Sequence, residues 1–143
     1  MSESRPTPGK ALAEQTYQFV HWLMPLVERL PRAHKFTLGD RMTSRSLNLL
    51  EGVVESVYTK DRAAILRRAQ LDIEQLQFLF RLCVDLQAIS QRPYEYAART
   101  LDGIGREIGG WQKAHYAQTT RPSVRPDRQL LGAARGRAQG DPG

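Results

Sequence analysis

The side chains of this chain that are best placed to do chemistry are cations at a regular spacing. In one segment every seventh residue is basic, and these residues are Arg92, Arg99, Arg106 and Lys113. On an α-helix this spacing places them on one face over about 30 Å. Such an arginine stripe can follow a phosphate backbone. Glu95 and Asp102 each precede an arginine by four residues, so a solvated face of intrahelical ion pairs is an equally open interpretation.

A second set of cations marks a predicted helix–helix corner, and we call Arg32, Lys35 and Arg41 the basic corner. Pro31 closes the apolar run before it. Thr37 is predicted to be the N-cap of the helix that follows, with Asp40 in the first turn. The corner is either a solvated basic surface or a binding patch. Another pair of cations, Arg67 and Arg68, is expected in the first turns of a later helix, where positive charge does not favour the helix dipole.

Signatures of catalysis are absent from the sequence. The glycines of 103–109 have the wrong spacing for a dinucleotide-binding loop and lie inside a predicted helix. The three histidines have no metal-ligand spacing, and Cys83 reads as a small core residue. Glu51 and Glu55 are one turn apart, which is typical of a solvated helix face. We therefore predict a protein that is not an enzyme and uses no metal or cofactor.

The composition favours a negatively charged partner. The net charge is +6 and the isoelectric point is about 9.9. Residues 1–116 hold 16 Lys and Arg against 13 Asp and Glu, so the excess is not confined to the tail. A single cysteine suits a reducing compartment. With no secretory signal and no apolar run long enough to cross a bilayer, we expect a cytoplasmic protein without a membrane partner.

Apolar residues recur at three- and four-residue spacing in four segments, which predicts helices over about 10–30, 38–58, 62–89 and 93–115. Pro25 is expected to kink the first helix or split its last turn, and Thr59 or Asp61 is expected to cap the third. No segment shows the alternation of a strand. The predicted fold is an all-α, antiparallel four-helix bundle over residues 10–116. Residues 1–9 are expected to be a disordered N-terminus, and residues 117–143 a disordered basic tail.

The third helix has two apolar faces. The first suffices for a bundle core and consists of Ile65, Leu66, Ala69, Ile73, Leu76, Phe80 and Cys83. The second lies off that stripe and consists of Leu71, Phe78, Leu82, Val84, Leu86 and Ile89. A helix that is apolar on two sides must be buried on two sides. We predict that Leu71, Phe78, Leu82 and Leu86 form an oligomer interface in a closed ring, with a wider intramolecular core as the alternative.

Four segments carry a resemblance to a known family. They are Arg-Ala-His-Lys-Phe-Thr-Leu-Gly-Asp-Arg at 32–41, Leu-Arg-Arg-Ala at 66–69, Arg-Pro-Tyr-Glu-Tyr-Ala-Ala-Arg at 92–99, and Ile-Gly-Arg-Glu-Ile-Gly-Gly-Trp at 104–111. In these the chain resembles the accessory variability determinant proteins of diversity-generating retroelements. They belong to a wider group of bacterial four-helix proteins that includes the rRNA intervening-sequence proteins. Pro93 and the Arg/Gly/Pro tail depart from the family pattern.

The resemblance implies a non-catalytic, basic homopentamer. It would bind the reverse transcriptase of the element together with template RNA and cDNA, and so support mutagenic reverse transcription. The residues predicted to contact nucleic acid or polymerase are Arg67, Arg68, Arg92, Arg99, Arg106, Lys113, Arg32, Lys35 and Arg41. The alternative function is a structural four-helix oligomer of the intervening-sequence type with no nucleic-acid role.

Overall fold

The structure, a computed structural model, describes residues 8–119 of the 143-residue chain. Within this range the chain forms five α-helices and no β-strand: α1 (Pro8–Glu28), α2 (Arg32–Lys35), α3 (Leu38–Tyr58), α4 (Ala63–Asp85) and α5 (Gln91–Thr119). The chain divides into two compact units, Met1–Gln112 and Lys113–Gly143, and residues 113–119 are the described part of the second. The all-helical prediction is confirmed for the described range. The predictions for residues 1–7 and 120–143 lie outside it.

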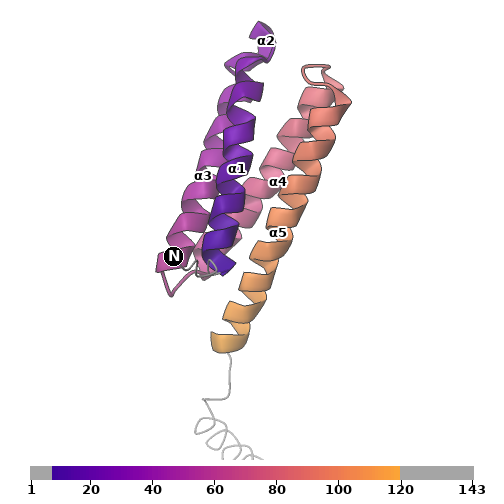
Figure 1. Cartoon of the computed structure of the whole chain (residues 1–143). Helices are drawn as coiled ribbons and strands as arrows, with labels where there is room; N and C mark the ends of the chain where they lie inside the picture. The colour runs from indigo at the N-terminus through magenta and orange to yellow at the C-terminus, as the bar shows by residue number, and fades with distance from the viewer. Residues whose placement is uncertain (1–7, 120–143) are drawn as a thin grey trace, which may run out of the picture. The chain divides into compact units, whose positions relative to one another are not determined.

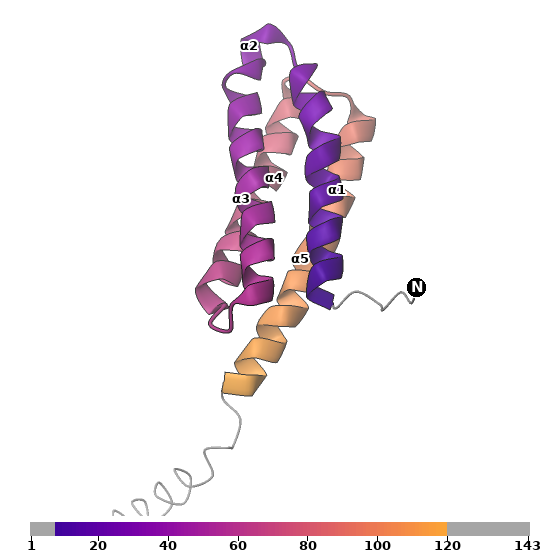
Figure 2. The same cartoon turned by 60° about the vertical axis from the view of Figure 1, so that its left-hand side comes forward.

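The long helices share one core in the first unit. Helix α3 packs against both α1 and α4, and the short helix α2 lies where α1 passes into α3 (Figures 1 and 2). Each long helix buries one face, because its apolar residues recur at three- and four-residue spacing. The aromatic centre of the core joins Phe19 and Trp22 of α1 to Phe80 of α4, with ring centroids 5.8–6.2 Å apart.

Two glutamines set the register between α4 and α5. Gln70 donates from Nε2 to the carbonyl of Gly105 at 3.0 Å and to Gln112 at 3.1 Å. Gln77, seven residues later, donates to the carbonyl of Ala98, seven residues before Gly105. Because the order is reversed between the helices, α4 and α5 run in opposite directions. A Cβ at position 105 would lie 3.4 Å from Gln70 Oε1, which is an ordinary contact, so this approach of the helices does not require a glycine.

Helix α3 has the predicted bounds, whereas α1 and α5 each begin two residues earlier than predicted and α5 continues to Thr119. Residues 8–9 and 117–119 are therefore helical and not disordered as predicted. Helix α1 continues through Pro25 to Glu28 as one helix, so a split of its last turn is not seen. Proline lacks the N–H that would bond the carbonyl four residues earlier, and its ring crowds that carbonyl, but the helical pattern resumes with the bond of Arg29 N–H to the carbonyl of Pro25 at 3.2 Å. The corner after α1 contains the four-residue helix α2, which was not predicted.

The predicted N-cap position of α3, with Asp40 in the first turn, is confirmed, whereas the predicted N-cap of α4 is wrong. Thr37 occupies the N-cap position of α3, but its hydroxyl donates to the carbonyl of His34 at 3.3 Å and makes no cap bond. The short helix α2 supplies this competing acceptor three residues upstream. The N-cap of α4 is Arg62 rather than Thr59 or Asp61. Arg62 instead donates from Nε to the carbonyl of Thr59 at 3.0 Å.

The third helix is shorter than predicted, because α4 ends at Asp85 and not at Ile89. Gln87 adopts a left-handed conformation, with φ of 61°. The backbone N–H of Ala88 then bonds the carbonyl of Cys83 at 2.7 Å, which closes the helix end. The reversed chain returns Ile89 to the core. Glycine is the usual residue in a left-handed conformation at a helix end. Because this position holds a glutamine, the sequence contains no signal that the helix ends here.

Candidate functional site

The basic corner lies on α2 and the first turns of α3. Arg32 and Arg41 are exposed, and neither has a carboxylate within ion-pair distance among residues 8–119. Lys35 is half-buried, and its Nζ lies 5.7 Å from the centre of the Phe36 ring. The corner therefore presents cations whose charge is not neutralised by a neighbouring acid in the described part of the chain.

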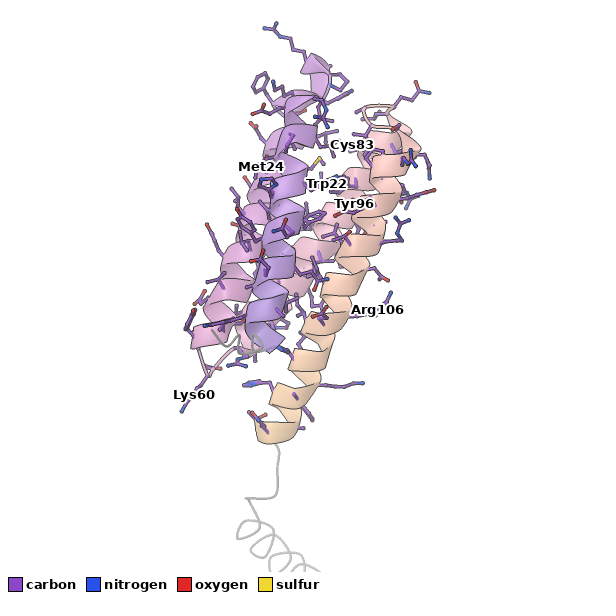
Figure 3. All side chains as sticks on the ribbon, in the orientation of Figure 1. Trp22, Met24, Lys60, Cys83, Tyr96 and Arg106 are labelled. Carbon is purple, nitrogen blue, oxygen red and sulfur yellow. The ribbon has the colours of Figure 1, made fainter. Side chains whose placement is uncertain are left out.

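The arginine stripe follows α5, where Arg92, Arg99 and Arg106 are all exposed and Figure 3 shows Arg106 directed away from the helices. Arg106 forms an ion pair with Asp102, and the hydrogen bond that Arg106 donates to Asp102 raises the pKa of this arginine. The ion-pair interpretation is confirmed for this residue. Lys113 lies on the same helix in the second unit and is also exposed.

The other predicted pair of the stripe does not form. Glu95 accepts a hydrogen bond from Gln91 Nε2 at 3.2 Å instead of pairing with Arg99. Within residues 8–119, Arg92 and Arg99 have no ion-pair partner. The N-terminal half of the stripe thus carries two unneutralised guanidinium groups, whereas Arg106 is neutralised locally.

The cations of α4 flank a buried carboxylate. Arg67 and Arg68 are exposed, and Arg68 Nε lies 3.9 Å from Asp72 Oδ1. The Asp72 side chain is only 1% exposed, and neither of its oxygens accepts a hydrogen bond within the described structure. Burial raises the pKa of Asp72, and the charges of Arg68 and Arg45 oppose that shift. Arg45 was not among the predicted site residues, since nothing in its sequence context marks it.

Asp72→Asn is expected to raise the melting temperature at neutral pH, because the variant no longer buries an ionised carboxylate. A raised folded-state pKa means that the native state binds this proton more tightly than the unfolded state does. The destabilising contribution is therefore present above the folded pKa and disappears as pH falls towards the unfolded value of 3.8. The advantage of the variant should shrink on acidification, as measured by thermal melts across this range.

Asp85→Asn is the matched control, since Asp85 is exposed on the same helix and pairs only with Arg81. Its effect should stay within about 0.5 kcal/mol. A loss of stability in Asp72→Asn at neutral pH would show that the pairing with Arg68 and Arg45 outweighs the cost of burial.

The second apolar face of α4 opens onto the surface. Leu71, Phe78 and Leu82 line a groove between α3 and α4, which we call the apolar groove, and Phe78 is 64% exposed. Leu86 is exposed beyond them, whereas Val84 is half-buried and Ile89 is buried. The wider intramolecular core does not cover the four predicted interface residues. Arg41 of the basic corner and Arg45 line the same groove.

A second exposed apolar surface was missed by the sequence reasoning. Tyr17 of α1 lies with Val54 and Tyr58 of α3 around a shallow groove between these helices, and all three are exposed. We call it the α1–α3 surface. The signal in the sequence is the four-residue spacing of Val54 and Tyr58, which places them off the buried stripe of their helix. The two apolar surfaces lie on opposite sides of α3, and each uses a different partner helix.

The residues that could support catalysis are dispersed. Cys83 is buried and burial raises its pKa, which favours the unreactive thiol. Glu51 and Glu55 are exposed beside a shallow depression between α3 and α4. Among residues 8–119 no cluster of three or more His, Cys, Asp or Glu side chains could hold a metal ion. No helix in the same range is long and apolar enough to cross a membrane.

The fold is similar to that of a solved protein. The crystal structure of a protein of unknown function from the S23 ribosomal protein family of Bacteroides thetaiotaomicron superposes with a TM-score of 0.69. The match covers 75% of this chain and 99% of the other, at 14% sequence identity, and so concerns the fold alone. No curated protein sequence matches the chain.

A family model described as bAvd-like matches residues 11–115, which span α3, α4 and most of α1 and α5. The chain therefore belongs to the bAvd-like family, in which bAvd denotes the bacterial accessory variability determinant. Accessory proteins of this family are generally non-catalytic. The predicted family resemblance is confirmed at this level.

Proposed function

We propose that the protein is a non-catalytic accessory protein of a diversity-generating retroelement. In this function it binds the reverse transcriptase and the template RNA or cDNA through its basic surfaces and supports mutagenic reverse transcription. Membership of the bAvd-like family supports the accessory class. The proposal for the ligands rests on charge, since the partners must be negatively charged where they meet the arginines.

The observation that carries the proposal is the set of arginines without a local counter-charge. Arg92 and Arg99 on α5, and Arg32 and Arg41 at the basic corner, are exposed and have no ion pair among residues 8–119. The planar guanidinium group suits two-point contacts with phosphate. Arg106 differs from these four arginines, since its guanidinium is paired with Asp102 and is less available to a ligand.

The same proposal includes assembly. We propose that each subunit is an antiparallel four-helix bundle and that the subunits close into a ring, five-fold by resemblance to the family. A ring needs two different complementary surfaces on each subunit, so that one copy's patch meets another patch on its neighbour. The apolar groove and the α1–α3 surface are two such patches on one subunit. Packing one against the other would cover Phe78 and Tyr58 together.

The nucleic-acid part of the proposal is tested with Arg92→Gln combined with Arg99→Gln in the full chain. We expect the affinity for single-stranded RNA to fall about 10-fold at moderate salt. The plot of log K against log salt should become less steep by about 1.4, because each lost phosphate contact accounts for about 0.7 of the negative slope. Fluorescence anisotropy with labelled RNA over a salt series measures both quantities, while light scattering should show an unchanged mass.

Arg106→Gln is the matched control from the same face of α5. Its guanidinium is already paired with Asp102, so its loss should change RNA affinity less than either unpaired arginine does. An affinity of the wild type that does not depend on salt would contradict phosphate binding. That result would favour the structural oligomer with no nucleic-acid role.

A further inference from the structure

One exposed aromatic ring lies within the basic corner. Phe36 is the C-terminal cap of α2 and is 65% exposed, whereas Phe19 and Phe80 are fully buried and the exposed Phe78 lines the apolar groove. Helix α2 has four residues, none of them buried, so it provides no apolar surface against which the ring could pack. The segment thus holds a large apolar side chain in solvent.

The surroundings of Phe36 are cationic. Lys35 Nζ lies 5.7 Å from the centre of the ring, where a positive charge is attracted to the aromatic face. Arg32 and Lys35 are three residues apart on α2 and are therefore neighbours on its surface. Residues 29–45 contain five Lys and Arg against one acid, Asp40. Phe36 is therefore an exposed aromatic ring surrounded by cations, and not an isolated hydrophobic residue on a polar surface.

This combination has a specific chemical use. Proteins that hold single-stranded nucleic acid pair an aromatic platform, on which an unpaired base stacks, with cations that bind the flanking phosphates. Bases inside a duplex are already stacked on one another and are not available to such a ring. On α5 the exposed aromatic beside the arginines of the stripe is Tyr96, but its ring packs against Trp22 with centroids 4.6 Å apart, and it is 40% exposed against 65% for Phe36.

We infer that Phe36 is a stacking platform for an unpaired base of RNA, with Arg32, Lys35 and Arg41 binding the phosphates beside it. The inference rests on the proposed nucleic-acid function and adds a ligand class, namely single-stranded or looped RNA rather than duplex. It also assigns a different role to each basic surface. The basic corner selects unpaired RNA strands, and the arginine stripe contributes affinity for single-stranded and duplex RNA alike.

The test compares Phe36→Leu and Phe36→Trp in the full chain. The probe is a labelled RNA of about 12 nucleotides without self-complementarity, used alone and annealed to its complement. Leucine keeps apolar bulk but has no aromatic face, so single-strand affinity should fall about 5- to 100-fold while duplex affinity is retained. Phe36→Trp keeps an aromatic face, so its affinity for single strands should be close to that of the wild type. The salt slope should stay unchanged in Phe36→Leu but decrease by about 0.7 in Arg32→Gln.

The outcomes separate this inference from the proposed function. A wild type that binds neither probe removes the proposed function and the inference with it. If the wild type binds RNA and Phe36→Leu binds single strands as tightly as the wild type does, the inference alone is overturned. That result would indicate a protein-binding role for the Phe36 side chain. Equal losses for single strand and duplex, or a change in oligomer mass with Phe36→Leu, also overturn it, because Phe36 would then act through assembly.

Discussion

Replacing Phe80 by alanine is expected to lower the free energy of unfolding by about 3–5 kcal/mol. The Phe80 ring is fully buried and contacts Phe19 and Trp22 of α1, with centroids 6.2 Å away in both cases. Its removal loses apolar burial and leaves a cavity that the aromatic neighbours cannot fill without breaking their own contacts. Urea denaturation followed by circular dichroism, at a fixed subunit concentration, measures the change.

Phe78→Ala provides the matched control, because the same residue type lies two positions earlier on the same helix but on the surface. Within the isolated subunit it should change stability by no more than about 0.5 kcal/mol. Equal losses for the two variants, measured at a subunit concentration low enough to keep both monomeric, would mean that the second face of α4 contributes to the core of the subunit and is not available for assembly.

Phe78→Glu is expected to convert the assembled protein into subunits of 16.2 kDa that keep their helical content. Phe78 is more exposed than Leu71 and Leu82, the other exposed apolar residues of the apolar groove, so a carboxylate there costs little in the free subunit. In an interface the same carboxylate would replace apolar contacts and would have to be desolvated beside the arginines of the groove, at a cost of several kcal/mol. Light scattering coupled to gel filtration measures the mass, and circular dichroism measures the helicity.

Ala11→Glu controls for the added charge, since Ala11 is exposed on α1 and lines neither apolar surface. Its mass should equal that of the wild type. A wild type that is already monomeric at micromolar concentration would contradict the ring. A Phe78→Glu protein that loses its helicity would instead place Phe78 in the core of the subunit.

The helices could be predicted where hydrophobic periodicity alone decides them. Helix α3 has the predicted bounds because its buried stripe begins and ends with it. The first apolar face of the third helix is likewise buried, apart from the half-buried Ile65. The ends of the helices were harder to predict, because they depend on backbone geometry. The left-handed Gln87 and the hydroxyl of Thr37 bonded to His34 both follow local contacts that residue type does not specify.

The candidate surfaces were predictable in position but not in electrostatics. The spacing of charges placed Arg99 and Arg106 in equivalent situations, each four residues after an acid. In the structure only Arg106 is paired, because Gln91 competes for Glu95. The burial of Asp72 and the exposure of Phe36 depend on which helices meet around them. Tertiary packing determines the exposure of both side chains, and the spacing of residues along the sequence does not specify that packing.

The hydrogen bonds of Gln70 bear on an ambiguity inherent in repetitive helices. The buried residues of α5 recur with a seven-residue period, so sliding the helix by one period along α4 would keep apolar residues facing apolar residues. Such a slip would bring Ala98 or Gln112 to the place of Gly105. A backbone carbonyl would still face Gln70, as the bond of Gln77 to Ala98 shows for a residue with a Cβ. The side-chain bond to Gln112 would be lost, because Gly105 or Thr119 would take its place and neither has a side-chain amide. The paired amides of Gln70 and Gln112 therefore break the translational degeneracy of the helix pair and penalise slipped registers during folding.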